Sequence, residues 1–443
     1  MNPDLQNLLL QTYLQTMWRS FRTRNALLDW QENQVRAHLM DVVPRSKALQ
    51  DRFAGRSVSE WRALEPIDKS VMMATFTDLN TVGLTLEEAM YAALRAETTR
   101  DFSPEIRGVT VGLSSGTSGH RGLFVVPPEE RAAWAGHLLA CMLPHPLVWP
   151  RRDRVAFFLR ANSTLYETTR SRRVQFEYFD LMEDLDGQVP RLQDLDPTIV
   201  VAPPSTLRRL AKRLLAGHLR LAPIKVISVA EVLDPIDERF LRQTFGQTIH
   251  QVYQATEGFL GSTCAYGTLH LAEDVVAVER EMLDDQHFRP ILTDFRRSAQ
   301  PIVRYRLNDV LRLRPVPCSC GSVLQPLASI EGRDDDVFVG LRGGQEVPVF
   351  ADFLRRAVLT AHADVADYGI RQLAPDQLGI WFESTPTAGD DPAAIRQAIE
   401  RALTGVFDRL GCRTPAYTVV DAWPEGGMTK RKRVERAFAW DPT

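Results

Sequence analysis

The chain has 443 residues, of which 44% are hydrophobic and 25% charged, values typical of a folded globular protein. Its formal net charge is −3 at pH 7, so it has no overall positive field for phosphate neutralisation, and we expect no nucleic-acid partner. At about 100 to 200 residues per domain, this length predicts two or three domains.

We expect a cytoplasmic protein with no membrane partner. The segment from Met1 to Trp18 mixes polar residues with leucines, so the basic and unbroken apolar parts of a signal peptide are missing. Later apolar runs fall short of the roughly 18 residues that span a bilayer. Five cysteines are too few for a disulfide framework here, so a cysteine cluster would indicate metal binding or catalysis.

The first predicted element is an amphipathic helix, because apolar residues recur at helical spacing from Leu5 to Phe21. We expect its apolar face to pack in the core, and a homodimer contact is the alternative. Two β-branched runs follow, at 108–113 and 123–126, on either side of a segment rich in Ser, Gly and Thr. This pattern predicts a strand, a loop and a strand.

Further along the chain, strand and helix patterns alternate, which predicts a buried parallel sheet. The predicted strands are 154–159, 198–202 and 224–229, and the helices between them are 205–216 and 234–245. After the charged block 332–336, the pattern predicts a helix at 351–361, a strand pair around 379–382 and a helix at 392–410. We therefore predict an α/β protein with a large N-terminal domain at 1–331 and a small α+β domain at 332–443.

The loop between the first two strands has the composition of a phosphate-binding loop. It reads Ser114, Ser115, Gly116, Thr117, Ser118 and Gly119, and such hydroxyls and approachable amides suit a polyphosphate. An ordinary turn is the alternative, and the Gly-Lys-Ser/Thr ending of a Walker loop is missing. The segment 112–116 also fits G-x-S-x-G, in which Ser114 would be a hydrolase nucleophile, but the required helix does not follow.

Four more segments follow this loop in a characteristic order. They are Tyr253-Gln254-Ala255-Thr256-Glu257-Gly258, Arg304-Tyr305-Arg306-Leu307-Asn308-Asp309, Gly332-Arg333-Asp334-Asp335-Asp336 and Gly427-Met428-Thr429-Lys430-Arg431-Lys432-Arg433. The series resembles the adenylate-forming ligases, from about residue 60 to the end of the chain. Within them it looks like the branch of phenylacetate–CoA ligases and of coenzyme F390 synthetases, which adenylylate a deazaflavin phenol. The segment 66–81 is similar to the latter group.

The resemblance implies an ATP site with Mg²⁺ bound by Thr117 and Glu257, whose hard oxygens suit this ion. Asp309 would accept both ribose hydroxyls, although a surface pair of Asp309 with Arg304 or Arg306 is the simpler alternative. Arg333 would meet the ribose or phosphate side. The remaining residues implied to line the nucleotide are Ala230 and Glu231 at one wall of the adenine, Tyr253 stacked on it, and Gln254, Ala255 and Thr256.

The resemblance also implies a catalytic lysine and a hinge near the C-terminus. Lys430 takes the lysine position, judged by its spacing to Arg433, and its cation would stabilise charge that develops during adenylation. Lys432 is a competitor for this role, and a solvated basic tail is the alternative. Asp335 would be the hinge about which the C-terminal domain rotates between two half-reactions.

Three residues depart from the pattern of the family. His120 stands where most relatives carry a lysine, Gln254 replaces the glycine after the tyrosine, and Asn308 replaces the glycine before the aspartate. The first bears on phosphate handling, and the other two bear on loop geometry.

Cys264, His270, Cys318 and Cys320 form a possible zinc site. Three thiolates and an imidazole suit a closed tetrahedral Zn²⁺, although the C-x-C spacing is tighter than usual and cysteines also serve as core residues. Some members of the phenylacetate ligase branch look similar at these positions.

We therefore predict an ATP-dependent ligase that converts a carboxylic acid, by preference an aromatic one, to an acyl adenylate and releases pyrophosphate. The acyl group would then pass to CoA or another thiol. The alternatives are adenylylation of a phenol, transfer to an amine or hydroxyl, and a nucleotide-binding module without turnover.

Overall fold

The computed structural model describes residues 2–99, 104–113, 122–147, 151–159, 168–169, 171, 173–333, 337–385, 391–420 and 432–440. The chain forms two compact units. Unit 1 comprises Met1–Ala230, Leu241–Leu307 and Leu313–Ser329, and unit 2 comprises Glu231–Phe240, Asn308–Arg312 and Ile330–Thr443. Unit 2 thus adds two short segments from the middle of the chain to its C-terminal part.

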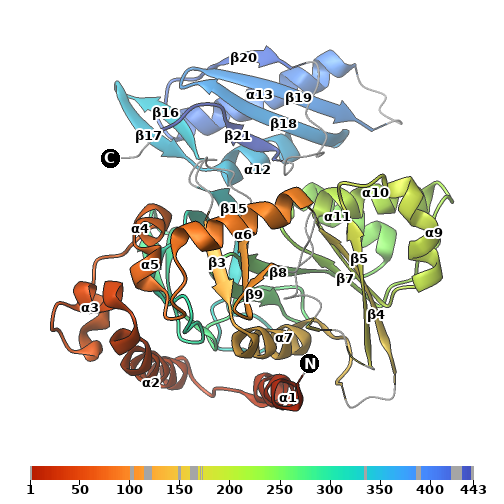
Figure 1. The fold of residues 1–443 in the computed structure, drawn as a ribbon. Helices are drawn as coiled ribbons and strands as arrows, with labels where there is room; N and C mark the ends of the chain where they lie inside the picture. Colours follow the sequence, from red (N-terminus) through yellow and green to blue (C-terminus); the bar gives the residue numbers. More distant parts are fainter. Residues whose placement is uncertain are drawn as a thin grey trace. The chain divides into compact units, whose positions relative to one another are not determined.

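Unit 1 begins with helices (red and orange in Figure 1). They are α1 (Pro3–Trp18), α2 (Arg24–Val42), η1 (Val43–Arg45), α3 (Lys47–Phe53), η2 (Val58–Ala63), α4 (Lys69–Ala74), α5 (Phe76–Leu79) and α6 (Leu86–Thr99). The Asn2 side chain caps α1 by accepting a hydrogen bond from the Asp4 N–H. A Cβ atom on Gly136 of α7 (Pro128–Met142) would lie 2.3 Å from the Leu9 carbonyl oxygen, so this glycine lets α1 and α7 approach closely.

The first sheet has the strand order β1-β2-β3, with β1 at Glu105–Ile106, β2 at Val109–Leu113 and β3 at Leu123–Val126. Strands β2 and β3 are antiparallel, with register from Thr110 opposite Val126 to Leu113 opposite Leu123. The two predicted strands are therefore confirmed. The predicted loop residues Ser114–Gly119 lie outside the described residues.

A seven-stranded sheet has the order β10-β9-β8-β7-β6-β4-β5. Its strands are β4 (Asp153–Leu159), β5 (Val174–Asp180), β6 (Ile199–Ala202), β7 (Lys225–Ser228), β8 (Ile249–Ala255), β9 (Gly258–Thr263) and β10 (Leu269–Leu271), and the crossover helices are α9 (Leu185–Leu195), α10 (Pro204–Leu215) and α11 (Pro235–Phe245). Strands β4 to β8 pair in parallel, as the alternation predicted, and β9 and β10 add antiparallel strands.

A third sheet, of five strands, has the order β11-β12-β14-β15, with β13 paired to β12. Its strands are β11 (Val276–Met282), β12 (His287–Asp294), β13 (Ile302–Arg306), β14 (Asp309–Leu313) and β15 (Leu327–Arg333). The turn between β12 and β13 is largely buried.

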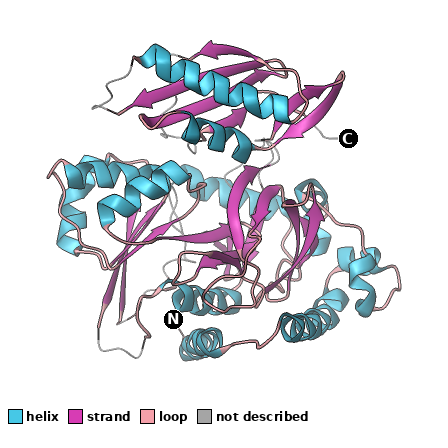
Figure 2. Cartoon of the chain, turned by 180° about the vertical axis from the view of Figure 1, so that it is seen from behind, coloured by secondary structure: helices cyan, strands magenta, loops and turns pink. Residues whose placement is uncertain are grey.

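The C-terminal part of unit 2 consists of a hairpin, a four-stranded sheet and two helices that lie on one face of this sheet (Figure 2). The elements are β16 (Phe338–Arg342), β17 (Gln345–Val349), α12 (Ala351–Ala361), β18 (Val365–Ala374), β19 (Gln377–Ser384), α13 (Pro392–Arg409), β20 (Ala416–Val419) and β21 (Val434–Arg436). Its core includes Leu354, Tyr368, Ile399 and Phe407, each fully buried. The predicted helices at 351–361 and 392–410 are confirmed to within one residue.

The α/β fold with parallel and mixed sheets is thus confirmed. Across the described residues, no helix combines the length and the apolar character needed to cross a membrane.

Candidate functional site

Two of the predicted nucleotide-binding segments follow neighbouring parallel strands of the seven-stranded sheet. Strand β7 ends at Ser228, which pairs with Gln251 of β8. Ala230 follows β7, and Thr256 and Glu257 follow β8, so both segments leave the carboxyl edge of the sheet, where open α/β sheets bind ligands. Ala230 has φ +66°, a strained conformation for a residue with a Cβ atom, and such strain often occurs at functional sites.

Glu257 is a buried carboxylate that one hydrogen bond orients. Its exposed fraction is 5%, and its Oε1 accepts a 2.8 Å hydrogen bond from the Tyr305 hydroxyl of β13. Among the described residues, Tyr305 is the hydrogen-bond partner of the Glu257 carboxylate. An oriented hard oxygen donor fits the Mg²⁺ role that was predicted for Glu257.

The turn that carries Glu257 is closely packed. The pairing of β8 with β9 shifts register between Tyr253 and Gln254, the residue that stands where the resembled family usually has a glycine. Gly258 has φ +155°, and a Cβ atom there would lie 2.8 Å from Asp294 Oδ2. A side chain at this position would require the Asp294 carboxylate to shift. Tyr253, the predicted adenine-stacking residue, is 7% exposed in β8.

The predicted ribose residue Asp309 is paired with the predicted nucleotide residue Arg333. Asp309 Oδ1 lies 3.7 Å from Arg333 Nε, and both belong to unit 2. The simpler alternative was a pair with Arg304 or Arg306. That alternative is wrong, because Arg304 pairs with Glu279 and Arg306 pairs with Glu281.

A buried polar turn, which the sequence did not single out, joins two of the predicted segments. Arg297 donates hydrogen bonds to the Thr256 carbonyl at 2.8 Å, the Val125 carbonyl at 3.1 Å and Gln300 Oε1 at 3.3 Å. Gln300 also accepts from the Val125 N–H at 3.1 Å and donates to the Leu123 carbonyl at 3.0 Å. These side chains therefore satisfy backbone groups on the edge of β3.

Glu130, in the first turn of α7, caps the same turn. Its Oε1 accepts hydrogen bonds from the Ser298 N–H at 2.8 Å and the Ala299 N–H at 2.6 Å. Burial raises the pKa of Glu130 to about 7, although Arg297 and the two backbone hydrogen bonds oppose this shift. Burial also raises the pKa of Asp294. Only the tertiary structure brings these acids together.

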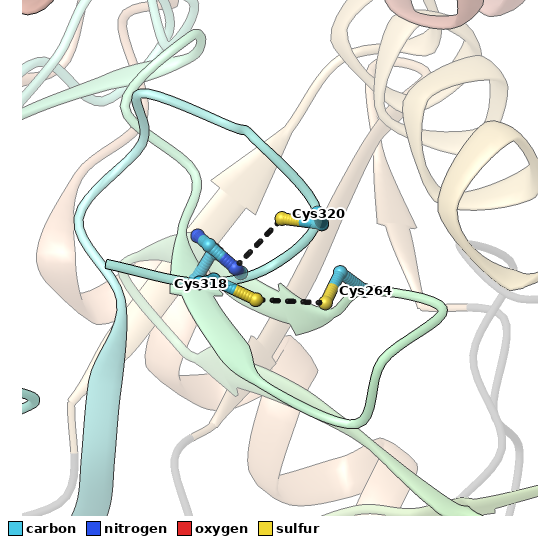
Figure 3. A group of neighbouring side chains, drawn as sticks. Cys264, Cys318 and Cys320 are labelled. Atoms are coloured by element: carbon cyan, nitrogen blue, oxygen red, sulfur yellow. Dashed lines mark hydrogen bonds between the residues drawn. The ribbon is translucent and has the colours of Figure 1, made fainter. Parts of the chain in front are cut away.

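The four predicted metal ligands lie together. One ligand atom from each of Cys264, His270, Cys318 and Cys320 lies within 4.8 Å of the other three. The Cys264 and Cys318 sulfurs are 3.7 Å apart, and Cys320 Sγ lies 3.5 Å from His270 Nε2. Figure 3 shows the three labelled sulfurs turned toward one another, with these two contacts dashed.

The surroundings orient the cluster. His270 Nδ1 lies 3.0 Å from the Leu324 carbonyl, so the Nδ1–H tautomer donates there and leaves the Nε2 lone pair toward the cysteines. Cys264 and His270 belong to the hairpin β9–β10, and an isolated bridge joins His270 to Pro326. Burial raises the pKa of Cys318, but hydrogen bonds from Thr268 and other neighbours outweigh it and lower the pKa below its usual value.

Several predicted residues lie outside the described part of the chain. They are Ser114, Ser115, Gly116, Thr117, Ser118, Gly119, Asp335 and Lys430. Lys432, the competitor of Lys430, is half-buried. Arg433 is buried and forms ion pairs with Asp237 and Asp367, so the alternative of a solvated basic tail is wrong at this residue.

No protein-family model and no curated protein matches the sequence. Solved structures do match. A 2-hydroxyisobutyryl-CoA ligase, in the postadenylation state with 2-HIB-AMP, has a TM-score of 0.67 at 14% identity, covering 92% of this chain and 89% of the ligase. The acyl acid amido synthetase AtGH3.15, in complex with 2,4-DB, has a TM-score of 0.56 at 13% identity, with 92% and 85% coverage.

The amide bond synthetase McbA from Marinactinospora thermotolerans has a TM-score of 0.51 at 15% identity, covering 72% of this chain and 67% of McbA. At such identities the similarity shows the fold alone. The resemblance to the adenylate-forming ligases is therefore confirmed at the level of the fold, which this chain shares with a CoA ligase and with amide-forming synthetases.

Proposed function

We propose that this protein is an ATP-dependent adenylate-forming ligase that activates a carboxylic acid and releases pyrophosphate. One observation carries the proposal. The chain shares its fold with 2-hydroxyisobutyryl-CoA ligase over 92% of its length. The buried carboxylate of Glu257, which follows the carboxyl end of β8, supports it.

In this proposal, Glu257 and Thr117 bind the Mg²⁺ of ATP, and the ion neutralises phosphate charge when bound. Asp309 binds the ribose hydroxyls, and Ser114–Gly119 bind the phosphates. Tyr253, Ala230 and Glu231 hold the adenine, with Gln254, Ala255 and Thr256 beside it, and Arg333 lies at the ribose or phosphate. The Arg333–Asp309 pair orients the Asp309 carboxylate before the nucleotide arrives.

The proposed second half-reaction transfers the acyl group to CoA or another thiol. The small domain at 332–443 would rotate about Asp335 between the half-reactions, and Lys430 would supply the cation for adenylation. More specifically, we propose that the acid is aromatic and that the chain belongs to the phenylacetate–CoA ligase branch. Transfer to an amine is a second candidate, because two structures with the same fold are amide-forming synthetases.

The test measures ATP-dependent pyrophosphate release with a panel of aryl and alkyl acids, together with a deazaflavin phenol. We expect release with at least one acid. The Glu257→Gln variant should lower that rate on the order of 10²-fold, since one oriented charge at the phosphates is lost. The control is Glu279→Gln. Glu279 lies on β11 and pairs with Arg304, and its replacement should change the rate less than about threefold. Absence of pyrophosphate release with every panel member would contradict the ligase proposal and favour a nucleotide-binding module without turnover.

We also propose that Cys264, His270, Cys318 and Cys320 bind a structural zinc ion. A tetrahedral zinc with bonds of about 2.3 Å to sulfur and about 2.0 Å to nitrogen sets sulfur–sulfur edges of about 3.8 Å and sulfur–nitrogen edges of about 3.5 Å. The separations of 3.7 Å and 3.5 Å fit these edges. At 3.7 Å the Cys264 and Cys318 sulfurs are not joined in a disulfide, whose S–S bond is about 2.05 Å.

The zinc proposal is tested by elemental analysis of the purified protein. We expect about one zinc per chain, and loss of most of it in Cys318→Ser and Cys320→Ser. Cys412→Ser is the matched control, a buried cysteine of unit 2, and should retain the metal. A strong chelator should also lower the unfolding temperature of the wild type but not of Cys318→Ser. Unchanged zinc in Cys318→Ser would contradict the site.

A further inference from the structure

The turn Asp294–Gln300, between β12 and β13, contains an arginine that is almost completely buried. Arg297 is 9% exposed, and Gln300 beside it is 1% exposed. A buried guanidinium is costly unless its N–H groups are hydrogen-bonded. Here two of its three outward hydrogen bonds reach main-chain carbonyls, one on each of two segments that are far apart in sequence. The arginine therefore links these two segments by hydrogen bonds.

The first of these segments is β3, an edge strand of its sheet. An edge strand leaves backbone groups unpaired, which a protein must satisfy by other means. Arg297 and Gln300 bind the carbonyls of Leu123 and Val125 and the N–H of Val125. On this edge, side chains of the turn therefore take the hydrogen-bonding place of a neighbouring strand.

The second segment is the turn that carries Glu257. Arg297 Nη1 binds the carbonyl of Thr256, the residue before Glu257, at 2.8 Å. The Glu257 carboxylate itself is held from another element, by the Tyr305 hydroxyl of β13 at 2.8 Å. Arg297 thus restrains the main chain next to Glu257, and Tyr305 restrains the side chain.

We propose that Arg297 and Tyr305 are positioning residues that together hold the Glu257 carboxylate in the place where it binds the metal of a metal–nucleotide complex. This inference rests on the proposed function, and it assigns roles to two residues for which the sequence predicted none. It requires that Arg297 act through its forked geometry, because a single ammonium group cannot bind the Thr256 and Val125 carbonyls in the same directions.

The variants are Arg297→Lys, which keeps the charge, and Tyr305→Phe, which removes one hydroxyl and keeps the packing. The matched control is Arg52→Lys. Arg52 also donates to two main-chain carbonyls of unit 1, those of Val303 and Glu65, both at 2.9 Å, but neither carbonyl adjoins Glu257. Any general effect of losing a guanidinium that binds two carbonyls should appear in both Arg297→Lys and Arg52→Lys.

The first measurement is the affinity for Mn²⁺ in the presence of α,β-methylene-ATP, by electron paramagnetic resonance. This analogue cannot be cleaved between its α and β phosphates, so the measurement does not depend on adenylate formation. We expect Arg297→Lys and Tyr305→Phe each to weaken Mn²⁺ binding about tenfold or more, and Arg52→Lys to leave it within about twofold. Equal affinity in the wild type and both site variants would overturn the inference and leave the proposed ligase intact.

The second measurement separates positioning from loss of stability. With an acid that supports pyrophosphate release, the Mg²⁺ concentration for half-maximal rate should rise in both site variants, and added Mg²⁺ should recover part of the rate. Thermal unfolding of Arg52→Lys and Arg297→Lys is compared in parallel. A rate loss in Arg297→Lys that high Mg²⁺ does not recover, and that Arg52→Lys shares, would mean that the role is structural. If the wild type binds no Mn²⁺–nucleotide complex, both the inference and the proposed function fail.

Discussion

Glu130 illustrates how burial changes the chemistry of one carboxyl group. Its Oε1 accepts two backbone hydrogen bonds, whereas Oε2 is buried and has no hydrogen-bond partner among the described residues. Burial therefore raises its pKa from 4.5 to about 7. Because this pKa is higher in the folded than in the unfolded state, the protonated Glu130 stabilises the fold. This stabilisation is complete below about pH 4.5 and is lost as the pH rises through about 7.

We expect the Glu130→Gln variant to remove this pH dependence. As the pH rises from 5 to 8, the free energy of unfolding of the variant minus that of the wild type should increase by about 1 to 3 kcal/mol. The reason is that glutamine carries no charge that must be buried. Urea unfolding at the two pH values measures the change. The exposed neighbour Glu129, replaced by Gln, should show no such trend. A difference that is constant with pH would contradict the raised pKa.

Individual residues differed in how far the sequence revealed them. Glu257 was predicted because it lies in a recognisable segment. Arg297 and Gln300 were not, because they act on main-chain atoms of segments more than forty residues away and carry no periodic pattern of their own. The run Asp294–Gln300, a polar segment between two apolar strands, was the one available signal.

At the scale of elements, helix α11 and strand β21 are joined by buried charges in unit 2. Arg433, just before β21, donates to both Asp237 oxygens, at 2.5 Å and 2.9 Å, and to Asp367 of β18 at 2.9 Å. Burial alone would lower the pKa of Arg433, but the neighbouring carboxylates raise it well above its ordinary value. The guanidinium therefore remains charged at neutral pH.

We expect Arg433→Met to destabilise unit 2 by about 3 to 5 kcal/mol, because it leaves Asp237 and Asp367 buried without their partner. Arg371→Met is the matched control on the neighbouring strand. Its pair with Glu435 is partly exposed, so the loss should stay near 1 kcal/mol or below. Chemical unfolding of both variants measures the difference. Equal losses would show that the buried network contributes no more than a surface pair.

The elements that the sequence predicted in each unit have a local cause, whereas α2 to α6 and the five-stranded sheet were not predicted. The α12 and α13 helices have apolar residues at helical spacing, and β4, β6 and β7 are short apolar runs between turn residues. The antiparallel addition of β9 and β10 to the parallel sheet was not predicted. It depends on pairing between strands, which a local pattern does not specify.

At the scale of the whole molecule, the sequence by itself determined the fold class, the order of the motifs and the identity of the four metal-ligand candidates. These depend on residue types and their spacing along the chain. The tertiary structure alone decided that Cys264 lies beside Cys318, that Asp309 pairs with Arg333, and that Arg297 joins β3 to the Glu257 turn. Such contacts join residues that are far apart in the chain, so their geometry follows from strand register and packing.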